Sequence, residues 1–254
     1  MLGKIARRII PESWRPIMYL TNQAYAGTNG TVYAGPFKGM HYIRAAFYSA
    51  YIPKLLGIYE KELNGAIAEA CGAGLQRVVD VGAAEGYYAV GLARLLPDAK
   101  VVAYEMTVEG QTLLREMCRI NDVASRVDIR GRCDRPELQA LLVDGLRTLV
   151  VCDCEGFEAI LLDPLRVPSL SNAWILVEVH DFVLPGLKEE LTDRFSATHD
   201  VQLIASQPRD ASEYPFHSFY SDTLPQSYRA WAVSEWRPGT MYWLWMRPKS
   251  PAGS

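Results

Sequence analysis

The stretch RVVDVGAAEGYYAVGL, residues 77–92, decides the fold of this chain. It begins with a short apolar run that contains one acid, Asp80, turns sharply at residues 82–86, and continues as a segment that can be helical. A buried parallel strand, a tight glycine turn and a helix form the first unit of a doubly wound α/β sheet. Ligands of such sheets bind at the carboxyl ends of the strands. We therefore expect this turn to lie against a cofactor.

The residues of the turn do not match a dinucleotide site. The fingerprint G-x-G-x-x-G needs its second glycine for the approach of a pyrophosphate and its third for close helix packing. Ala84 and Tyr87 occupy these two positions. Asp80 precedes the turn and Glu85 lies within it, and acids at a helix N-terminus disfavour phosphate. The two acids suit a cationic ligand such as S-adenosylmethionine, which carries a sulfonium and an ammonium group.

A second apolar run, residues 101–104, ends in Glu105. An acid at the tip of the second strand can accept both ribose hydroxyls, a need that NAD and S-adenosylmethionine share, so Glu105 does not distinguish them. Further contacts are expected beside Glu105, in the loop after the third strand, at the end of the fourth strand and before the first. The predicted cofactor-binding residues are Tyr59, Asp80, Gly82, Ala83, Ala84, Glu85, Gly86, Glu105, Met106, Cys133 and Asp153.

Composition limits the class of protein. The chain has 254 residues, 49% of them hydrophobic, which is enough for one large domain or for one domain with an added cap. Its 26 basic and 29 acidic residues give a formal charge of -3, which argues against a nucleic-acid binder. Five scattered cysteines are typical of reduced thiols in a cytosolic protein.

The N-terminus shows no sign of membrane insertion or secretion. No apolar run is long enough to span a bilayer, and the chain does not begin with the apolar core and cleavage site of a signal peptide. We expect a cytoplasmic protein without integral membrane contact. Residues 1–10, MLGKIARRII, form a short basic amphipathic segment. It is interpreted as a packed first helix, with weak contact to a membrane surface as the alternative.

The chain divides into a cap and a main domain. Residues 1–75 are expected to form an N-terminal helical and hairpin cap, with a hairpin in TVYAGPFKGMHYI, residues 31–43. Apolar residues at helical spacing predict one lead-in helix over residues 53–74. Residues 76–249 are expected to form the main α/β domain, with an insertion at about residues 207–240.

The insertion is rich in aromatic residues, which argues against disorder. A long insertion with little periodicity is usually functional when it is ordered. We interpret it as a wall that binds the acceptor substrate, through His217, Tyr220, Arg229 and Trp231. Ordinary packing against the N-terminal cap is the alternative.

Acids and one histidine follow the fourth and fifth predicted strands. Asp153 and Glu155 share one face if the chain stays extended, and Glu178 and His180 share another. His180 is the preferred general base, because its ordinary pKa lies near neutrality and Glu178 or Asp181 could orient its ring. Asp153 is the second candidate base, or the acceptor for the cofactor ammonium. The predicted catalytic residues are therefore His180, Asp153 and Glu178, and a hydrogen-bonded structural histidine is the alternative.

Two further interpretations concern the same acids. Glu155 and Glu158 can begin the short helix that follows, where negative charge is favourable. Asp153, Glu155, Glu178 and His180 are also ligand types for a divalent ion if their side chains converge. Sequence spacing does not establish that convergence, and we expect no metal.

These residues together resemble the FkbM-type group of class I S-adenosylmethionine-dependent methyltransferases. The resemblance covers residues 77–182 and rests on VVDVGAAEGYYAVGLA, on Glu105, on VEVH and above all on DCEGFEAILL, which is similar to the Asp-x-Glu-Gly-x-Glu pattern of that group. It implies a Rossmann-like, doubly wound seven-stranded sheet with the last strand antiparallel. It also implies methyl transfer to oxygen, often on a sugar or a natural-product hydroxyl. Ala84 departs from the commonest turn, G-x-G-x-G.

Two other classes stay open. An NAD-dependent oxidoreductase would keep the sheet and Glu105 but lacks the glycine fingerprint. A non-catalytic adenosyl-binding protein would keep the cofactor turn without an acceptor pocket. The expected partner is a small molecule that carries a hydroxyl group, and a homo-oligomer is compatible with the sequence.

Overall fold

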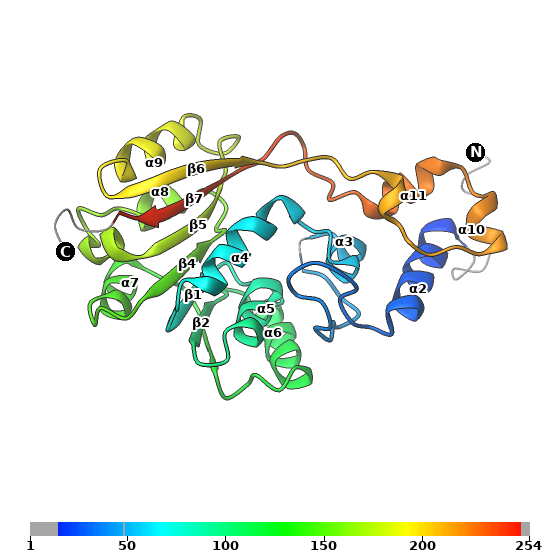
Figure 1. Cartoon of the computed structure of the whole chain (residues 1–254), viewed down its shortest axis with the longest axis horizontal. Helices are drawn as coiled ribbons and strands as arrows, with labels where there is room; N and C mark the ends of the chain where they lie inside the picture. Colours follow the sequence, from blue (N-terminus) through cyan, green and yellow to red (C-terminus); the bar gives the residue numbers. More distant parts are fainter. Residues whose placement is uncertain (1–14, 48, 250–254) are drawn as a thin grey trace. The chain divides into compact units, whose positions relative to one another are not determined.

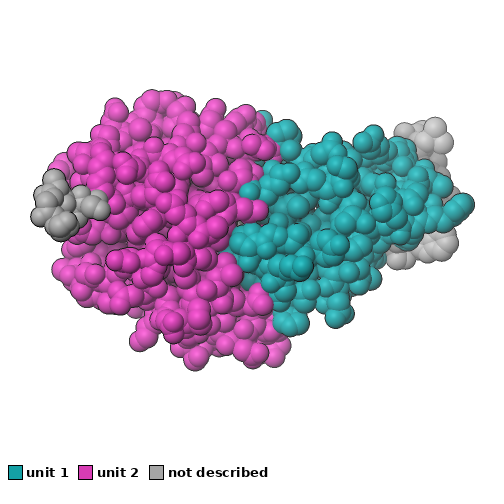
Figure 2. Space-filling model, in the orientation of Figure 1, with its two compact units in different colours: residues 1–61, 208–238 teal, residues 62–207, 239–254 magenta. Residues whose placement is uncertain are grey.

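The computed structural model describes residues 15–47 and 49–249. The basic segment over residues 1–10 lies outside the described residues. The chain forms two compact units (Figure 2): unit 1 contains residues 1–61 and 208–238, and unit 2 contains residues 62–207 and 239–254. Within the described part of the chain, none of the helices combines the length and apolar character needed to cross a membrane.

Unit 2 is built on one seven-stranded sheet (Figure 1) with the order β3-β2-β1-β4-β5-β7-β6. Strands β1 to β5 run parallel to one another, whereas β7 runs antiparallel to both β5 and β6. The predicted seven-stranded sheet with an antiparallel last strand is confirmed. The strands are β1 (Arg77–Val81), β2 (Lys100–Tyr104), β3 (Val127–Arg130), β4 (Thr148–Cys152), β5 (Trp174–Val179), β6 (His199–Ala205) and β7 (Tyr242–Pro248).

Helices cover both faces of this sheet, as a doubly wound fold requires. Alternate strand residues such as Val79 and Val150 pack with α7, α8 and α9 in one buried cluster. On the opposite face, Trp243 contacts Tyr88 of α5, and the indole of Trp245 donates a hydrogen bond to Glu69 of α4 at 2.9 Å. The helices are α4 (Asn64–Gly72), α5 (Tyr87–Leu95), α6 (Val108–Ile120), α7 (Arg135–Leu142), α8 (Glu158–Leu161) and α9 (Leu187–Phe195), with 3-10 turns at Lys61–Leu63 and Pro168–Asn172.

Unit 1 is mainly helical, and its later segment packs on its earlier one. Its helices are α2 (Pro16–Thr28), α3 (Tyr51–Leu56), α10 (Phe219–Thr223) and α11 (Gln226–Val233), with a 3-10 turn at Ala211–Glu213. The hairpin expected over residues 31–43 is reduced to a single antiparallel bridge between Thr31 and His41. The aromatic segment thus shares a compact unit with the N-terminal segment.

The single helix predicted over residues 53–74 is wrong, because two helices occupy this stretch. Helix α3 ends before Gly57, which adopts the left-handed conformation with φ 73°. A Cβ atom at Gly57 would lie 2.0 Å from the carbonyl oxygen of Ala34. The apolar periodicity continues across Gly57, so it does not reveal that a close backbone contact ends the helix there.

The turn after β1 is locked to the end of β4. A Cβ atom at Gly82 would lie 1.7 Å from the carbonyl oxygen of Asp153, and Gly82 has φ 88°. The Asp153 amide donates a hydrogen bond to the carbonyl of Val81 at 2.9 Å. Only a glycine fits both the backbone conformation and the available space. The turn after β1 and the acids that follow β4 consequently lie at one edge of the sheet.

We expect Gly82→Ala to destabilise the protein by at least about 3 kcal/mol, since strain in the left-handed region adds to a backbone clash. Urea unfolding of both proteins measures the change. Gly131→Ala is the matched control, because an added Cβ there meets nothing within 4 Å. Equal stability of Gly82→Ala and wild type would contradict this description of the turn.

Candidate functional site

Glu105 fastens the turn of β1 to the start of α6. It is 8% exposed, and its Oε2 accepts a hydrogen bond from the Ala84 amide at 3.1 Å. Its Oε1 accepts from the amide and the hydroxyl of Thr107 at 2.8 and 2.6 Å. Because a carboxylate offers about four acceptor positions, these three bonds leave capacity for a further donor. Glu105 therefore has a structural role that the sequence did not indicate.

The other predicted cofactor residues differ widely in exposure. Asp80, Glu85 and Cys133 are buried in the protein without ligand, whereas Met106, beside Glu105, is 73% exposed. Burial is the main cause that raises the pKa of the Cys133 thiol to about 12, so this thiol is neutral. Tyr59 belongs to unit 1, whereas the other members of the set belong to unit 2.

Gly82, Ala83, Ala84 and Gly86 form the turn itself. The amides of Gly82 and Ala83 both donate to the carbonyl of Tyr104 at 2.9 Å, which fixes the turn against β2. Ala84 has φ 48° and Gly86 has φ 97°. The position where the resemblance expects a glycine is thus in a glycine-type conformation, although alanine occupies it.

The ends of β4 and β5 bring a histidine among four carboxylates. The His180 side chain is 3% exposed, and its Nε2 atom lies 3.5 Å from Asp153 and 3.6 Å from Glu155. Glu178 lies 3.9 Å from the same nitrogen. The three predicted catalytic residues therefore converge, and β4 and β5 bring them together because they are adjacent parallel strands.

Glu158 orients the imidazole ring, not Glu178 or Asp181 as the sequence suggested. Its carboxylate is fully buried and accepts a hydrogen bond from Nδ1 of His180 at 2.9 Å, as well as one from the Cys154 amide at 2.9 Å. Asp181 instead accepts from the Lys188 amide at 2.9 Å. Glu158 is the last acid of the D-x-E-G-x-E pattern, and that pattern was the one sequence signal for its role. Its position at the start of a helix favoured a capping interpretation instead.

The cluster changes the acidity of His180. Burial lowers its pKa, but the hydrogen bond to Glu158 and the charges of Asp153, Glu158 and Glu178 outweigh burial and raise the pKa from 6.5 to about 9. The ring is therefore protonated at neutral pH in the protein without ligand. The ordinary pKa of histidine, on which the choice of His180 as general base depended, therefore does not apply in this cluster.

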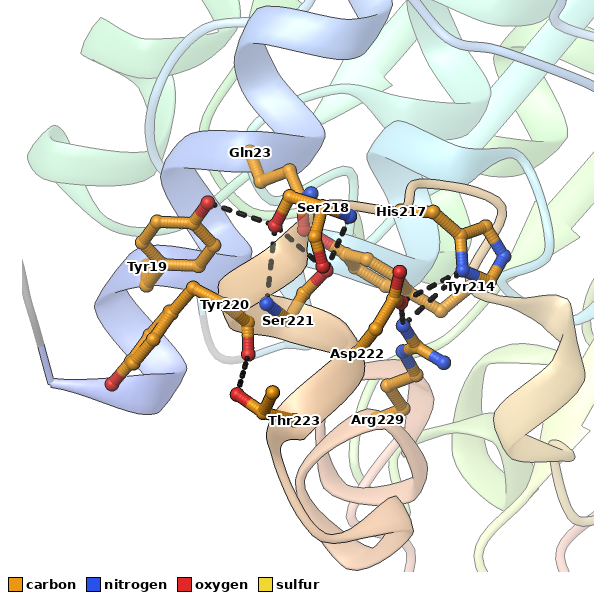
Figure 3. A network of polar contacts seen from close by, with 10 residues as sticks. All are labelled: Tyr19, Gln23, Tyr214, His217, Ser218, Tyr220, Ser221, Asp222, Thr223 and Arg229. Atoms are coloured by element: carbon orange, nitrogen blue, oxygen red, sulfur yellow. Dashed lines mark hydrogen bonds and ion pairs between the residues drawn. The ribbon is translucent and has the colours of Figure 1, made fainter.

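The residues predicted to bind the acceptor lie in unit 1, and three of them contribute to a polar network (Figure 3). Asp222 accepts hydrogen bonds from Nδ1 of His217 at 2.9 Å and from the guanidinium of Arg229. The ring of Tyr220 packs edge-on against Tyr19 with a centroid distance of 4.6 Å. These contacts fix the side chains but do not reveal a ligand.

Other aromatic residues of the same segment pack internally. Tyr214 is buried, and its hydroxyl donates to the carbonyl of Leu20 at 2.6 Å. The ring of Phe216 covers Gly27 so closely that a Cβ there would lie 2.4 Å away. Trp231 meets Trp236 edge-on at 4.5 Å. Packing within unit 1, the alternative interpretation, accounts for Tyr214 and Phe216.

No protein-family model matches this chain, and no curated protein matches its sequence. Its structure is similar to the O-methyltransferase TomG from Streptomyces achromogenes, involved in tomaymycin synthesis and solved in complex with SAM, at 13% identity and a TM-score of 0.47 over 96% of this chain and 95% of that one. It is also similar to an O-methyltransferase from Bacillus cereus in complex with SAH, at 13% identity and a TM-score of 0.46 over 96% of each chain.

A third similar structure is the precorrin-6y C5,15-methyltransferase from Geobacter metallireducens, at 13% identity and a TM-score of 0.45 over 73% of this chain and 89% of that one. Likenesses this distant carry no argument about activity. The function of this chain must therefore be argued from its own residues.

We expect the His180 ring, in protein treated with a chelator, to titrate with a pKa of about 9. NMR measures this value, with His180→Gln assigning the signal. Because the folded pKa exceeds the ordinary 6.5, the stabilisation is complete below that pH and is lost as the pH rises through 9. The free energy of unfolding of wild type, relative to His180→Gln, should fall by about 3 kcal/mol across this window. A pKa at or below the ordinary value would contradict the description of the cluster.

Proposed function

We propose that this chain is an S-adenosylmethionine-dependent methyltransferase that transfers a methyl group to a hydroxyl oxygen of a small molecule such as a sugar or a natural product. One observation carries the proposal: Glu105 at the end of β2 directly contacts the glycine-type turn of β1, through the bond from the Ala84 amide at 3.1 Å. This contact supports an adenosyl site at the carboxyl edge of a doubly wound sheet, with Glu105 at its ribose end. Ala84 in place of the second fingerprint glycine favours S-adenosylmethionine over a dinucleotide.

The residues present fit this cofactor. Glu105 keeps an acceptor position for ribose hydroxyls, and the exposed Met106 beside it offers an apolar surface for adenine. Asp153, whose side chain is 37% exposed, can accept the ammonium group. When bound, S-adenosylmethionine supplies an electrophilic methyl group on its sulfonium. The protein must then mainly position the nucleophile and accept its proton.

The proton of the acceptor hydroxyl passes to the acid–histidine cluster. Asp153 is a partly exposed member of this cluster, and Nε2 of the buried His180 lies 3.5 Å from it. Since His180 is protonated at neutral pH, Asp153 is the better first proton acceptor. Glu158 holds the ring from the other side through Nδ1. Glu178 adds negative charge that keeps the imidazolium in place.

The rival functions fit less well. A dinucleotide pyrophosphate would approach the second glycine of the fingerprint, where Ala84 carries a side chain instead. A non-catalytic adenosyl-binding protein has no need for a buried imidazole among four carboxylates, which is a costly arrangement. His217, Tyr220, Arg229 and Trp231 remain our proposed acceptor contacts.

Calorimetric titration tests the cofactor. We expect S-adenosylmethionine and S-adenosylhomocysteine to bind in the micromolar range, with NAD much weaker. Glu105→Gln should weaken adenosyl binding at least about tenfold, equal to about 1.4 kcal/mol, because it removes a carboxylate acceptor. Glu109→Gln is the matched control, since Glu109 is an exposed acid in the first turn of α6. No adenosyl binding, or a preference for NAD, would refute the proposal.

Methyl transfer to a panel of sugars and phenols, followed by mass spectrometry of the products, tests the proton acceptor. We expect Asp153→Asn to lower turnover at saturating S-adenosylmethionine by about 100-fold or more, because general bases contribute about 10²–10⁴ in rate. Asp181→Asn removes a neighbouring carboxylate that faces Lys188, so its turnover should match that of wild type. Unchanged turnover in Asp153→Asn would exclude this role.

A further inference from the structure

Several acidic side chains surround His180. Four carboxylates, those of Asp153, Glu155, Glu158 and Glu178, lie within 4.0 Å of one imidazole. In the part of the chain that the structure describes, His180 is the ion-pair partner of both Glu155 and Glu158. Carboxylates in a partly buried site are costly unless a cation compensates them. Glu155 and Glu158 share the single charge that a proton on His180 supplies.

Three donor atoms of this cluster already face a common point. One oxygen of Asp153, one oxygen of Glu155 and a ring nitrogen of His180 all lie within 4.8 Å of one another. Donors around an octahedral divalent ion at about 2.1 Å lie about 3–4 Å apart. A small movement of Glu155, whose side chain is 79% exposed, is enough to close the difference.

The histidine is oriented as a ligand. Its Nδ1 atom is held by Glu158 at 2.9 Å, whereas its Nε2 atom, on a side chain that is 3% exposed, has no hydrogen bond within the described residues. Histidines that bind metals usually donate their other ring nitrogen to a carboxylate in this way. The Oε2 atom of Glu158 is also buried without a hydrogen-bond partner among the described residues. Glu158 thus has unfilled acceptor capacity on the Nδ1 side of the ring.

We propose that Asp153, Glu155 and His180 bind one divalent transition-metal ion, with Mn²⁺ as the type, and that Glu158 positions the imidazole. Two carboxylates and one imidazole suit Mn²⁺ better than Ca²⁺ or Mg²⁺, which prefer oxygen donors alone. The ion takes the place of the proton on Nε2. Three protein donors leave coordination positions open, and an acceptor hydroxyl can bind at one of them. This last step rests on the proposed function, but the metal site does not.

The proposal reverses the expectation of a site without metal. That expectation depended on spacing alone, which does not reveal whether side chains from two strands converge. In the structure Asp153 and His180 follow adjacent parallel strands, and their donor atoms converge on one point.

Electron paramagnetic resonance with Mn²⁺ alone tests the site, on the full chain stripped with a chelator and without any adenosyl compound. The six-line signal of free Mn²⁺ should disappear with one equivalent bound per chain. Glu155→Gln should weaken binding at least tenfold. Glu158→Gln should weaken it by about 10–100-fold, as is typical when the partner of a metal-binding histidine is lost. Asp181→Asn, which removes a charge beside His180 but outside the donor set, should stay within twofold of wild type.

The outcomes separate this inference from the proposed function. The metal site is supported if wild type binds Mn²⁺ saturably, Glu155→Gln weakens that binding and Asp181→Asn leaves it unchanged. This holds even if no adenosyl compound binds. The metal site is overturned if wild type does not bind Mn²⁺ at millimolar concentration. Circular dichroism must show that wild type and all variants are folded. Equal Mn²⁺ affinity in wild type and Glu155→Gln also overturns it.

Discussion

The backbone contact between Gly82 and Asp153 is the constraint on which the rest of the site depends. The space at Gly82 is so limited that a Cβ atom would lie 1.7 Å from the Asp153 carbonyl. The contact joins the turn after β1 to the end of β4. Since β4 pairs with β5, His180 is brought to the same edge. A turn that can receive a cofactor and a cluster that can accept a proton therefore form together, and neither can shift without the other.

Electrostatics then decides how the cluster works. An isolated buried imidazole would be neutral, because burial disfavours the charged form. Here the Glu158 hydrogen bond and the neighbouring carboxylates reverse that effect and raise the pKa of His180 to about 9. The negative carboxylates thus favour a cation at the imidazole, either a proton or the proposed metal ion. With a proton on His180, Asp153 is the proposed base, whereas a metal ion would activate the acceptor oxygen directly.

The sequence predicted the strands well, because strands buried on both faces appear as near-continuous apolar runs. Asp134, an acid directly before a helix that begins with Arg135-Pro136, caps α7 by accepting a hydrogen bond from the Glu137 amide at 2.9 Å. Two features were missed for physical reasons. The break at Gly57 depends on a contact with Ala34, which is distant in sequence. The role of Glu158 depends on a side chain from β5, and the pKa of His180 depends on carboxylates from both strands. Hydrophobic periodicity describes one helix or strand at a time, so it cannot predict contacts between residues that are distant in sequence.

The central claim is that the carboxyl edge of the unit 2 sheet binds an adenosyl cofactor through the turn of β1 and Glu105. The most direct measurement is a crystal structure of the complete chain with S-adenosylhomocysteine. The account predicts ligand density along the ends of β1, β2 and β4, with the ribose hydroxyls on Glu105 and the amino-acid end near Asp153. Ligand density elsewhere on the chain, or a ribose that makes no contact with Glu105, would contradict it.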